Sequence, residues 1–164
     1  MTGTGPALTA EELDRVRAQA TEEYPSECCG VVLARPGRPD DRVFLRCRNV
    51  QDELHRRDPE RHGRDARTAY YIDPKDLLTI GRHEGTGYRV RTIYHSHIDA
   101  GAYFSETDRR NAMLGDEPSY PQATYVVTSV MTGRVDGMAA FRWDATQRDF
   151  VARELAANDV RSAR

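Results

Sequence analysis

The stretch RVRTIYHSHIDAGAYFSETD, residues 89–108, joins a β-like segment to the start of a helix. Arg89–His95 is rich in β-branched and aromatic residues, which predicts a strand. Residues 98–104, made flexible by Gly101, form a loop, and Ser105–Leu114 is expected to be helical. A strand, a loop and a helix in this order are typical of an α/β domain.

Four polar residues of this stretch follow the pattern H-x-H-x7-S-x2-D: His95, His97, Ser105 and Asp108. Residues two apart on a strand point to the same side, so both imidazoles can approach one ion. If Ser105 is the N-cap of the helix, Asp108 lies in its first turn, where the helix dipole favours an ionised carboxylate. Two histidines and one carboxylate are the ligand set of a catalytic zinc, whose fourth position stays open.

Each half of the pattern also has an ordinary structural explanation. A lone His-x-His pair is more often two surface or core histidines, and a Ser-x-x-Asp sequence alone is more often a simple helix cap. A competing pattern, His95-x-His97-x-Asp99, begins a metallo-β-lactamase-like signature, but Ala100 stands where that signature has histidine. The other histidines all lie upstream, at His55, His62 and His83. The competing site therefore lacks its downstream ligands, and Asp99 is expected to be a solvated loop residue or a group that supports a ligand.

Hydrolysis at zinc also needs a base, and the chain has no H-E-x-x-H sequence to supply one. The H-x-H-x7-S-x2-D pattern resembles the JAMM motif of the JAB/MPN+ metalloprotease family. Residues 24–30, YPSECCG, resemble the P-x-E-x-C-G segment of its compact bacterial branch. The resemblance covers roughly residues 11–143. It implies a JAB1/MPN-like, cytidine-deaminase-like α/β fold, a single mixed-sheet domain flanked by helices.

The resemblance also implies a role for each motif residue. His95, His97 and Asp108 would bind Zn²⁺. Glu27 would be the general base that takes a proton from the attacking water and passes it to the leaving amine. Ser105 would donate a hydrogen bond to the tetrahedral oxyanion. Without the downstream motif, Glu27 would be interpreted as a charged residue at a strand edge.

The resemblance also implies a zinc-dependent isopeptidase or peptidase that uses a metal-activated water. It would cleave after the C-terminal Gly-Gly tail of a ubiquitin-like or sulfur-carrier protein, which would be its partner. Two alternatives stay open: a non-catalytic MPN-type interaction module, and a zinc hydrolase of small amides on the same fold. Ile98 and Phe104 stand where eukaryotic members usually have proline, which argues against the eukaryotic deubiquitinase branch.

Hydrophobic periodicity and turn residues place the other elements of the chain. A capping box at Thr9 and Glu12 starts a helix that ends before Pro25, and Asp73-Pro74 starts a second helix. The charged segment Gln51–Arg67 is expected to be a mobile or functional loop, able to order over a substrate tail or simply solvated. Strands are predicted at Cys28–Ala34, Val43–Val50, Thr68–Ile72, Ala123–Val130 and Val135–Trp143.

Length and composition indicate one domain: a disordered start over residues 1–8, the domain over 9–153, and a frayed or helical tail over 154–164. The net charge of -2 argues against nucleic acid as a partner, and no apolar run is long enough for a membrane span. Met1–Ala7 lacks the features of a secretory signal, which predicts a cytoplasmic protein. The three cysteines, Cys28, Cys29 and Cys47, have no C-x-x-C spacing, so reduced and buried thiols are expected.

Overall fold

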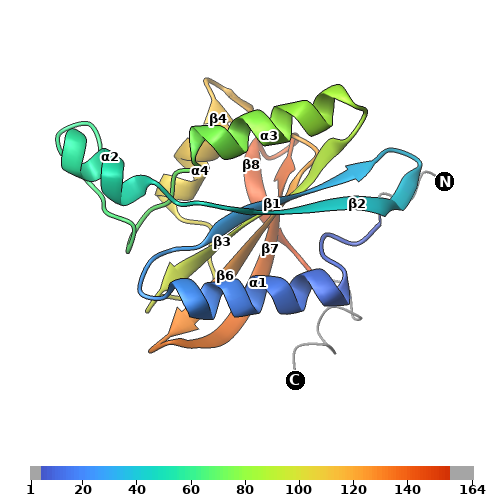
Figure 1. The fold of residues 1–164 in the computed structure, drawn as a ribbon. Helices are drawn as coiled ribbons and strands as arrows, with labels where there is room; N and C mark the ends of the chain where they lie inside the picture. Colours follow the sequence, from blue (N-terminus) through green and yellow to red (C-terminus); the bar gives the residue numbers. More distant parts are fainter. Residues whose placement is uncertain (1–4, 156–164) are drawn as a thin grey trace.

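A computed structural model describes residues 5–155, which form a six-stranded sheet with helices against both faces (Figure 1). The strands lie in the order β2-β1-β3-β6-β7-β8; β3 and β6 are parallel, and every other neighbouring pair is antiparallel. Their bounds are β1 Cys29–Arg35, β2 Arg38–Cys47, β3 Arg89–Ile98, β6 Thr124–Met131, β7 Arg134–Asp144 and β8 Asp149–Arg153. The predicted mixed sheet flanked by helices is confirmed.

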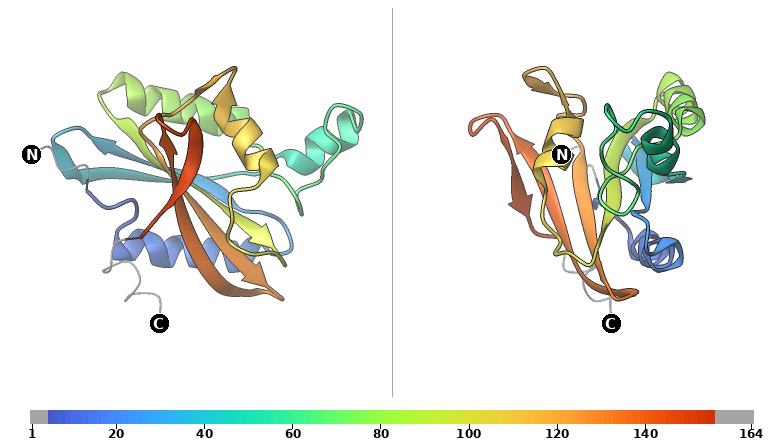
Figure 2. Two further views of the ribbon diagram at one scale, coloured as in Figure 1. Left: turned by 180° about the vertical axis from the view of Figure 1, so that it is seen from behind. Right: turned by 90° about the vertical axis from the view of Figure 1, so that its left-hand side faces the viewer.

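Helices α1 and α3 cover opposite faces of this sheet, and α4 lies on the face of α3. Figure 2 shows α4 in front of the sheet in its left view, beside the turn between β7 and β8. No helix within residues 5–155 is long and apolar enough to cross a membrane. The remaining elements are α1 Ala10–Glu23, α2 Gln51–Arg57, α3 Pro74–Gly85, α4 Glu106–Ala112, β4 Met113–Leu114 and β5 Glu117–Pro118.

Helix α1 begins where the sequence predicts. Thr9 Oγ1 accepts a hydrogen bond from Glu12 N at 3.2 Å, and the Glu12 carboxylate accepts one from Thr9 N at 2.8 Å. Leu13, Val16 and Ala20 follow at helical spacing and are all buried against the sheet. The capping box therefore sets the start of the helix, and the apolar stripe sets which side packs.

Strands β1 and β3 are buried on both faces, so their successive residues enter two different cores. Val31 of β1 and Ile93 of β3 pack in the core that includes residues of α3 and α4. Val32 and Tyr94, their neighbours in sequence, pack in the core that includes α1. This alternation determines which face of the sheet receives the polar residues of β3.

Gly30 is required by the close approach of β1 to Tyr94. A Cβ atom at Gly30 would overlap the buried Tyr94 ring, and the Tyr94 hydroxyl is already held by a hydrogen bond to Gln19 Oε1 at 2.6 Å. We expect Gly30→Ala to lower the free energy of unfolding by about 1–3 kcal/mol, because an overpacked core must move to accept the methyl group. Urea denaturation measures this change. Gly137→Ala in β7, where nothing lies within 4 Å of the added Cβ, should be tolerated; equal losses in both variants would contradict the steric explanation.

Two expectations for residues 51–72 are wrong. Gln51–Arg67 is not an irregular loop throughout, because it begins with α2, whose acidic first turn and basic last turn suit the helix dipole. Thr68–Ile72 is not a strand: its only ladder contact is a single bridge between Ile72 and Asn49. The Asn49 side chain replaces a strand partner, accepting from Tyr71 N at 3.0 Å and donating to the Ala69 carbonyl at 3.2 Å.

Other differences concern element boundaries. Strand β2 runs over Arg38–Cys47 rather than Val43–Val50, because Gly37 makes a tight turn with φ of 77° that starts the strand earlier. Strand β8 and the short β4–β5 ladder are not predicted. The helix expected to reach Leu114 ends at Ala112, and Gly115 lies in the β4–β5 turn.

The ends of the domain differ from expectation as well. Disorder is predicted through residue 8, yet Leu8 is fully buried and the Ala7 carbonyl accepts a hydrogen bond from Thr92 Oγ1 at 2.5 Å. Arg153 ends strand β8 at the last residue of the predicted domain, and Leu155, which lies in the predicted tail, packs against the α1 core. The rest of the predicted tail, residues 156–164, lies outside the described residues.

Candidate metal centre

His95 and His97 lie near the end of β3, in the middle of the sheet between β1 and β6. They follow Ile93 at intervals of two residues, so they face the α3 and α4 side. Ser96 points to the other face, where its Oγ accepts a hydrogen bond from Cys28 N at 2.7 Å. The two imidazoles therefore share one face, as their spacing predicts.

Asp108 reaches the histidines from the first turn of α4. Ser105 caps this helix: its Oγ accepts from Asp108 N, and Asp108 Oδ2 accepts from Ser105 N, both at 3.0 Å. This capping box has aspartate in place of the usual glutamate or glutamine. The same Oδ2 lies 3.1 Å from His95 Nε2 and 3.0 Å from His97 Nε2. The cap thus orients the carboxylate toward the imidazoles.

The three side chains converge with the spacing of ligands around one ion. The two Nε2 atoms are 3.3 Å apart, and His95, His97 and Asp108 form the one candidate metal-binding group found among residues 5–155. Tetrahedral zinc with bonds of about 2.0–2.1 Å places its ligand atoms about 3.3 Å apart. Relative exposures of 0%, 5% and 6% for these three residues keep bulk water from most of the group. The donor set and its spacing fit Zn²⁺.

The electrostatics of the group also suit a cation. Burial alone would raise the pKa of Asp108, but the imidazoles of His95 and His97 and the backbone N–H of Ser105 lower that pKa well below its ordinary value. The carboxylate is therefore ionised, as a metal ligand must be.

The orientation of His97 is set by a loop carbonyl. His97 Nδ1 lies 2.9 Å from Gly101 O, and because a carbonyl can only accept, Nδ1 donates this hydrogen bond and Nε2 is the ring nitrogen that faces the centre. The loop is held in turn by Ser129 Oγ, which donates to Ala100 O at 2.6 Å. This support was not evident from sequence, because it joins segments that are about thirty residues apart.

Asp99 is turned away from the histidines. Its carboxylate accepts hydrogen bonds from Tyr24 Oη at 2.8 Å and from Thr132 N at 2.7 Å, and its residue is exposed. These contacts tie the loop after β3 to the end of α1 and to the turn between β6 and β7. Asp99 is therefore a loop residue rather than a member of the metal group.

A cavity of ≈ 310 Å³ opens beside the metal group, and Glu27, His97 and Ser105 all line it. Glu27 lies two residues before the start of β1 at Cys29; it is 4% exposed, and its Oε1 atom has no hydrogen-bond partner within residues 5–155. Its backbone is fixed, because Glu27 N donates to Ala66 O at 2.7 Å. All five residues that the sequence singles out thus meet at one place.

The environment of Glu27 makes the stability of the metal-free protein depend on pH. Burial, and to a lesser extent the charge of Asp108, raise the pKa of Glu27 to about 9, against the opposing charge of Arg64. In the unfolded chain this pKa is about 4.3. Between these two pKa values the folded chain holds a proton that the unfolded chain releases. The free energy of unfolding of the metal-free protein therefore falls as the pH rises through this range.

The glutamine side chain of Glu27→Gln cannot ionise. In chelator-treated samples at pH 8, this variant should therefore have a higher free energy of unfolding than the wild type. The expected gain is on the order of 2–4 kcal/mol, and it should shrink toward pH 5. Urea denaturation at the two pH values tests this. A difference between the proteins that does not change with pH would show that Glu27 is not the group responsible.

Two aromatic residues at the site were not anticipated. The Tyr70 ring stacks on His95 at 4.6 Å between centroids, and Tyr103 meets His97 edge-on at 4.9 Å. Tyr103 lies in the loop between His97 and Ser105, so its sequence position alone indicates that it is near the motif. Tyr70 lies in the segment wrongly predicted as a strand, so no local signal places it against His95.

The cysteines take no part in the metal group. Cys28, Cys29 and Cys47 are free and buried, as the sequence predicts. Cys29 Sγ is 3.9 Å from the Cys47 carbonyl oxygen, and burial raises the pKa of the Cys29 thiol well above its ordinary value. A neutral buried thiol is a packing residue rather than a ligand.

Solved structures of other proteins share this fold over most of the chain. Solution structures of proteins from Desulfitobacterium hafniense and Salinibacter ruber match with TM-scores of 0.61 and 0.57. They are 20% and 22% identical, and each match covers 90% of this chain and 88% of the other, which shows a shared fold. Tail tip assembly protein K of Escherichia phage N15 is 35% identical over 102 residues, 62% of this chain but 34% of the phage protein. The chain therefore spans about a third of that relative.

A sequence model of one family matches residues 9–145, which include every residue of the metal group and its cavity named above. That family is described as prokaryotic homologs of the JAB domain. With the fold and the His-His-Asp group already in place, the match makes this chain a member of the prokaryotic JAB-domain family.

Proposed function

We propose that this protein is a zinc-dependent peptidase or isopeptidase. It would act on a ubiquitin-like or sulfur-carrier protein and cleave the amide bond that follows a C-terminal Gly-Gly tail. The observation that carries the proposal is the cavity in which Glu27 and Ser105 stand beside the His97 member of the metal group. A cytoplasmic setting, where free thiols such as Cys28 stay reduced, is part of the proposal.

His95, His97 and Asp108 would hold the ion. Zinc in such a site lowers the pKa of a water molecule and polarises a carbonyl group. Glu27 would accept the proton of the attacking water and deliver it to the leaving amine. One oxygen of the Glu27 carboxyl group has no internal partner and is available for this task. Burial raises the pKa of Glu27 in the metal-free protein, and a bound cation beside it would favour the ionised form that can accept a proton.

Ser105 would serve both the helix and the reaction. Its cap uses Oγ as an acceptor for Asp108 N, so the hydroxyl proton is free to be donated into the cavity. A donor aimed at the developing oxyanion is commonly worth a factor of about 10²–10³ in rate. The capping role therefore places the proposed donor without competing with it.

A purely structural role explains these residues less well. Burying three ionisable side chains and a further carboxyl group away from water costs free energy unless a bound ion or ligand interacts with them. An interaction module needs none of these groups, whereas a hydrolase needs all of them.

The test combines metal analysis with a cleavage assay. We expect about one zinc per chain in protein purified without chelators. The protein should release a small carrier protein that ends in Gly-Gly from linear or lysine-linked adducts. Loss of cleavage with a chelator, and its return with added zinc, would support the mechanism. One bound zinc without cleavage of any amide substrate would favour the interaction module.

A further inference from the structure

The three members of the metal group differ in how their orientation is fixed. His97 Nδ1 donates to Gly101 O at 2.9 Å, and the Asp108 carboxylate accepts from Ser105 N at 3.0 Å. Within the described part of the chain, the buried Nδ1 atom of His95 has no hydrogen-bond partner. Histidines that bind a metal usually donate this second ring N–H to an acceptor, which fixes the ring. His95 must therefore be oriented in another way.

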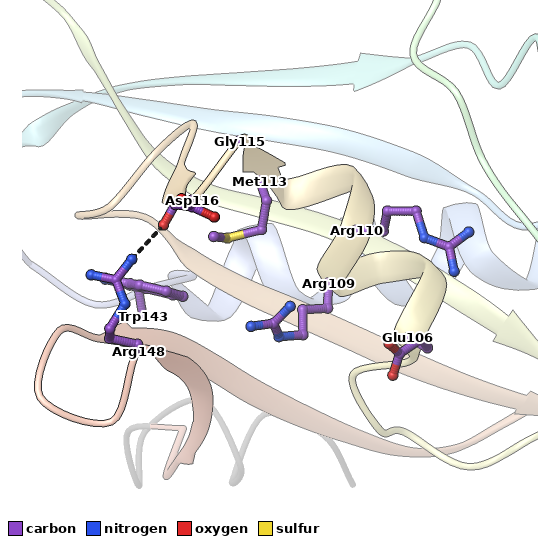
Figure 3. A pocket seen from close by; sticks show the side chains of 8 residues that line it. All are labelled: Glu106, Arg109, Arg110, Met113, Gly115, Asp116, Trp143 and Arg148. Carbon is purple, nitrogen blue, oxygen red and sulfur yellow. Dashed lines mark hydrogen bonds between the residues drawn. The ribbon is translucent and has the colours of Figure 1, made fainter.

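The helix that presents Asp108 is also held from its far side. A cavity of ≈ 430 Å³ borders the outer side of α4 (Figure 3). Arg109, which lines this cavity, pairs with Asp149 at 2.9 Å and so joins α4 to the start of β8. Arg148 donates to the Asp116 carbonyl at 2.9 Å, the contact drawn as a dashed line in Figure 3. Of the three ligands, His95 is thus the one that polar contacts outside the metal group do not explain.

The ring of Tyr70 lies face to face with the imidazole of His95. Their centroids are 4.6 Å apart and their planes are inclined by 25°, a stacked pair at the close end of the usual range of about 4.5–7 Å. Because His95 is also fully buried, turning its imidazole would drive one edge of the ring into the face of Tyr70. The stack therefore restrains the imidazole in the orientation that keeps Nε2 among the other ligands.

Tyr70 is held in place by the side chain of Asn49. Asn49 Nδ2 donates to Ala69 O at 3.2 Å, and Asn49 Oδ1 accepts from Tyr71 N at 3.0 Å, so the backbone is fixed on both sides of Tyr70. The same Nδ2 donates to Glu27 O at 2.8 Å. One amide group thus attaches the segment of Tyr70 to the segment of the proposed base, and the aromatic ring has a defined place against the metal group.

We propose that Tyr70 is a positioning residue for the metal ligand His95, and that its ring has the orienting role that the Gly101 carbonyl has for His97. The proposal rests on the metal site of the proposed function and is independent of its substrate. Without the ring, the imidazole would be free to turn, because Nδ1 has no acceptor to hold it. Zinc would then have to restrict the imidazole as it binds, and that loss of conformational freedom weakens the affinity.

Zinc dissociation constants of three variants test this role, measured on the full chain by competition with a chromophoric chelator. Tyr70→Leu removes the ring but keeps an apolar side chain, and its dissociation constant should be about tenfold higher than that of the wild type. Tyr70→Phe keeps the ring and should stay within about twofold of the wild type, as should the control Tyr71→Leu. Tyr71 is the adjacent residue, and its side chain is exposed.

The visible absorption spectrum of the Co²⁺-loaded protein provides a readout that a general loss of stability would not move. The spectrum reports the geometry of the ligands around the ion, so it should change in Tyr70→Leu and be retained in Tyr70→Phe. Circular dichroism of chelator-treated samples shows whether each variant folds without metal. If Tyr70→Leu does not fold, Tyr70→Met takes its place, because methionine fills irregular gaps and also lacks a ring.

Equal zinc affinities for Tyr70→Leu and the wild type would overturn the proposal. A loss in Tyr70→Phe as large as that in Tyr70→Leu would also overturn it, because the effect would then belong to the hydroxyl group. Neither measurement needs a substrate, so the proposed function is tested separately. The expected zinc affinities in a protein that cleaves no amide would retain the positioning role and refute the peptidase. Cleavage by the wild type, with unchanged zinc affinity in Tyr70→Leu, would do the reverse.

Discussion

Glu27→Gln should keep about one zinc per chain and lower the rate of amide cleavage by about 10²–10⁴-fold, the usual contribution of a positioned acid–base group. The amide side chain has nearly the same shape, so the cavity and the hydrogen bond from Glu27 N to Ala66 O should persist. It cannot accept a proton at neutral pH, which is the property that the reaction needs. Zinc should remain, because the histidines and Asp108 are unchanged and Glu27 is not part of the candidate metal group.

Metal content and kcat measured on the same preparation decide this prediction. Glu22→Gln is the control: it makes the same chemical change on the exposed surface of α1, where the side chain pairs with Arg46. Its rate should stay within about twofold of the wild type, since surface substitutions are usually small in effect. Wild-type rates for Glu27→Gln would show that another group moves the proton.

The metal group was predictable because its geometry is local. Strand alternation places His95 and His97 on one side, and the Ser105 cap fixes Asp108, so each half follows from a few neighbouring residues. Glu27 needed the family resemblance, because sequence spacing alone does not join it to the motif. The structure explains the connection: β1 pairs with β3 in a register that sets Cys29 opposite His95, which brings the start of β1 to the end of β3.

The incorrect predictions concern segments in which tertiary contacts outweigh the local sequence pattern. Thr68–Ile72 has strand-like residues but is satisfied by the Asn49 side chain instead of a ladder. Strand β8 was missed because Phe150 is its only buried residue, which leaves little apolar alternation to detect. Arg64 and Arg67, which line the Glu27 cavity, belong to the segment expected to be a mobile or functional loop, since charge in a sequence does not reveal which cavity it faces.

His97→Ala should lose both bound metal and activity, the second large effect expected. Removing the imidazole leaves two ligands of three, and the Nε2 atom that lies 3.0 Å from Asp108 is gone. Binding of a ligand to the folded state alone stabilises it by about 4.1 kcal/mol when its free concentration is a thousand times Kd. Zinc should therefore raise the Tm of the wild type by several degrees and leave the Tm of His97→Ala unchanged.

A matched histidine provides the control for this loss. His83 lies on α3, contacts Tyr88 and is outside the metal group, so His83→Ala should keep its zinc and its zinc-dependent rise in Tm. The variant His97→Ala also isolates the ligand role from the acid–base role, because Glu27 remains in place.

If His97→Ala retained one zinc per chain, the ion would have to be held elsewhere. The convergence of His95, His97 and Asp108 would then reflect only their mutual hydrogen bonding. Paired loss of metal and cleavage in His97→Ala, with metal retained but cleavage lost in Glu27→Gln, is the pattern that only a metal-dependent hydrolase with a separate base produces.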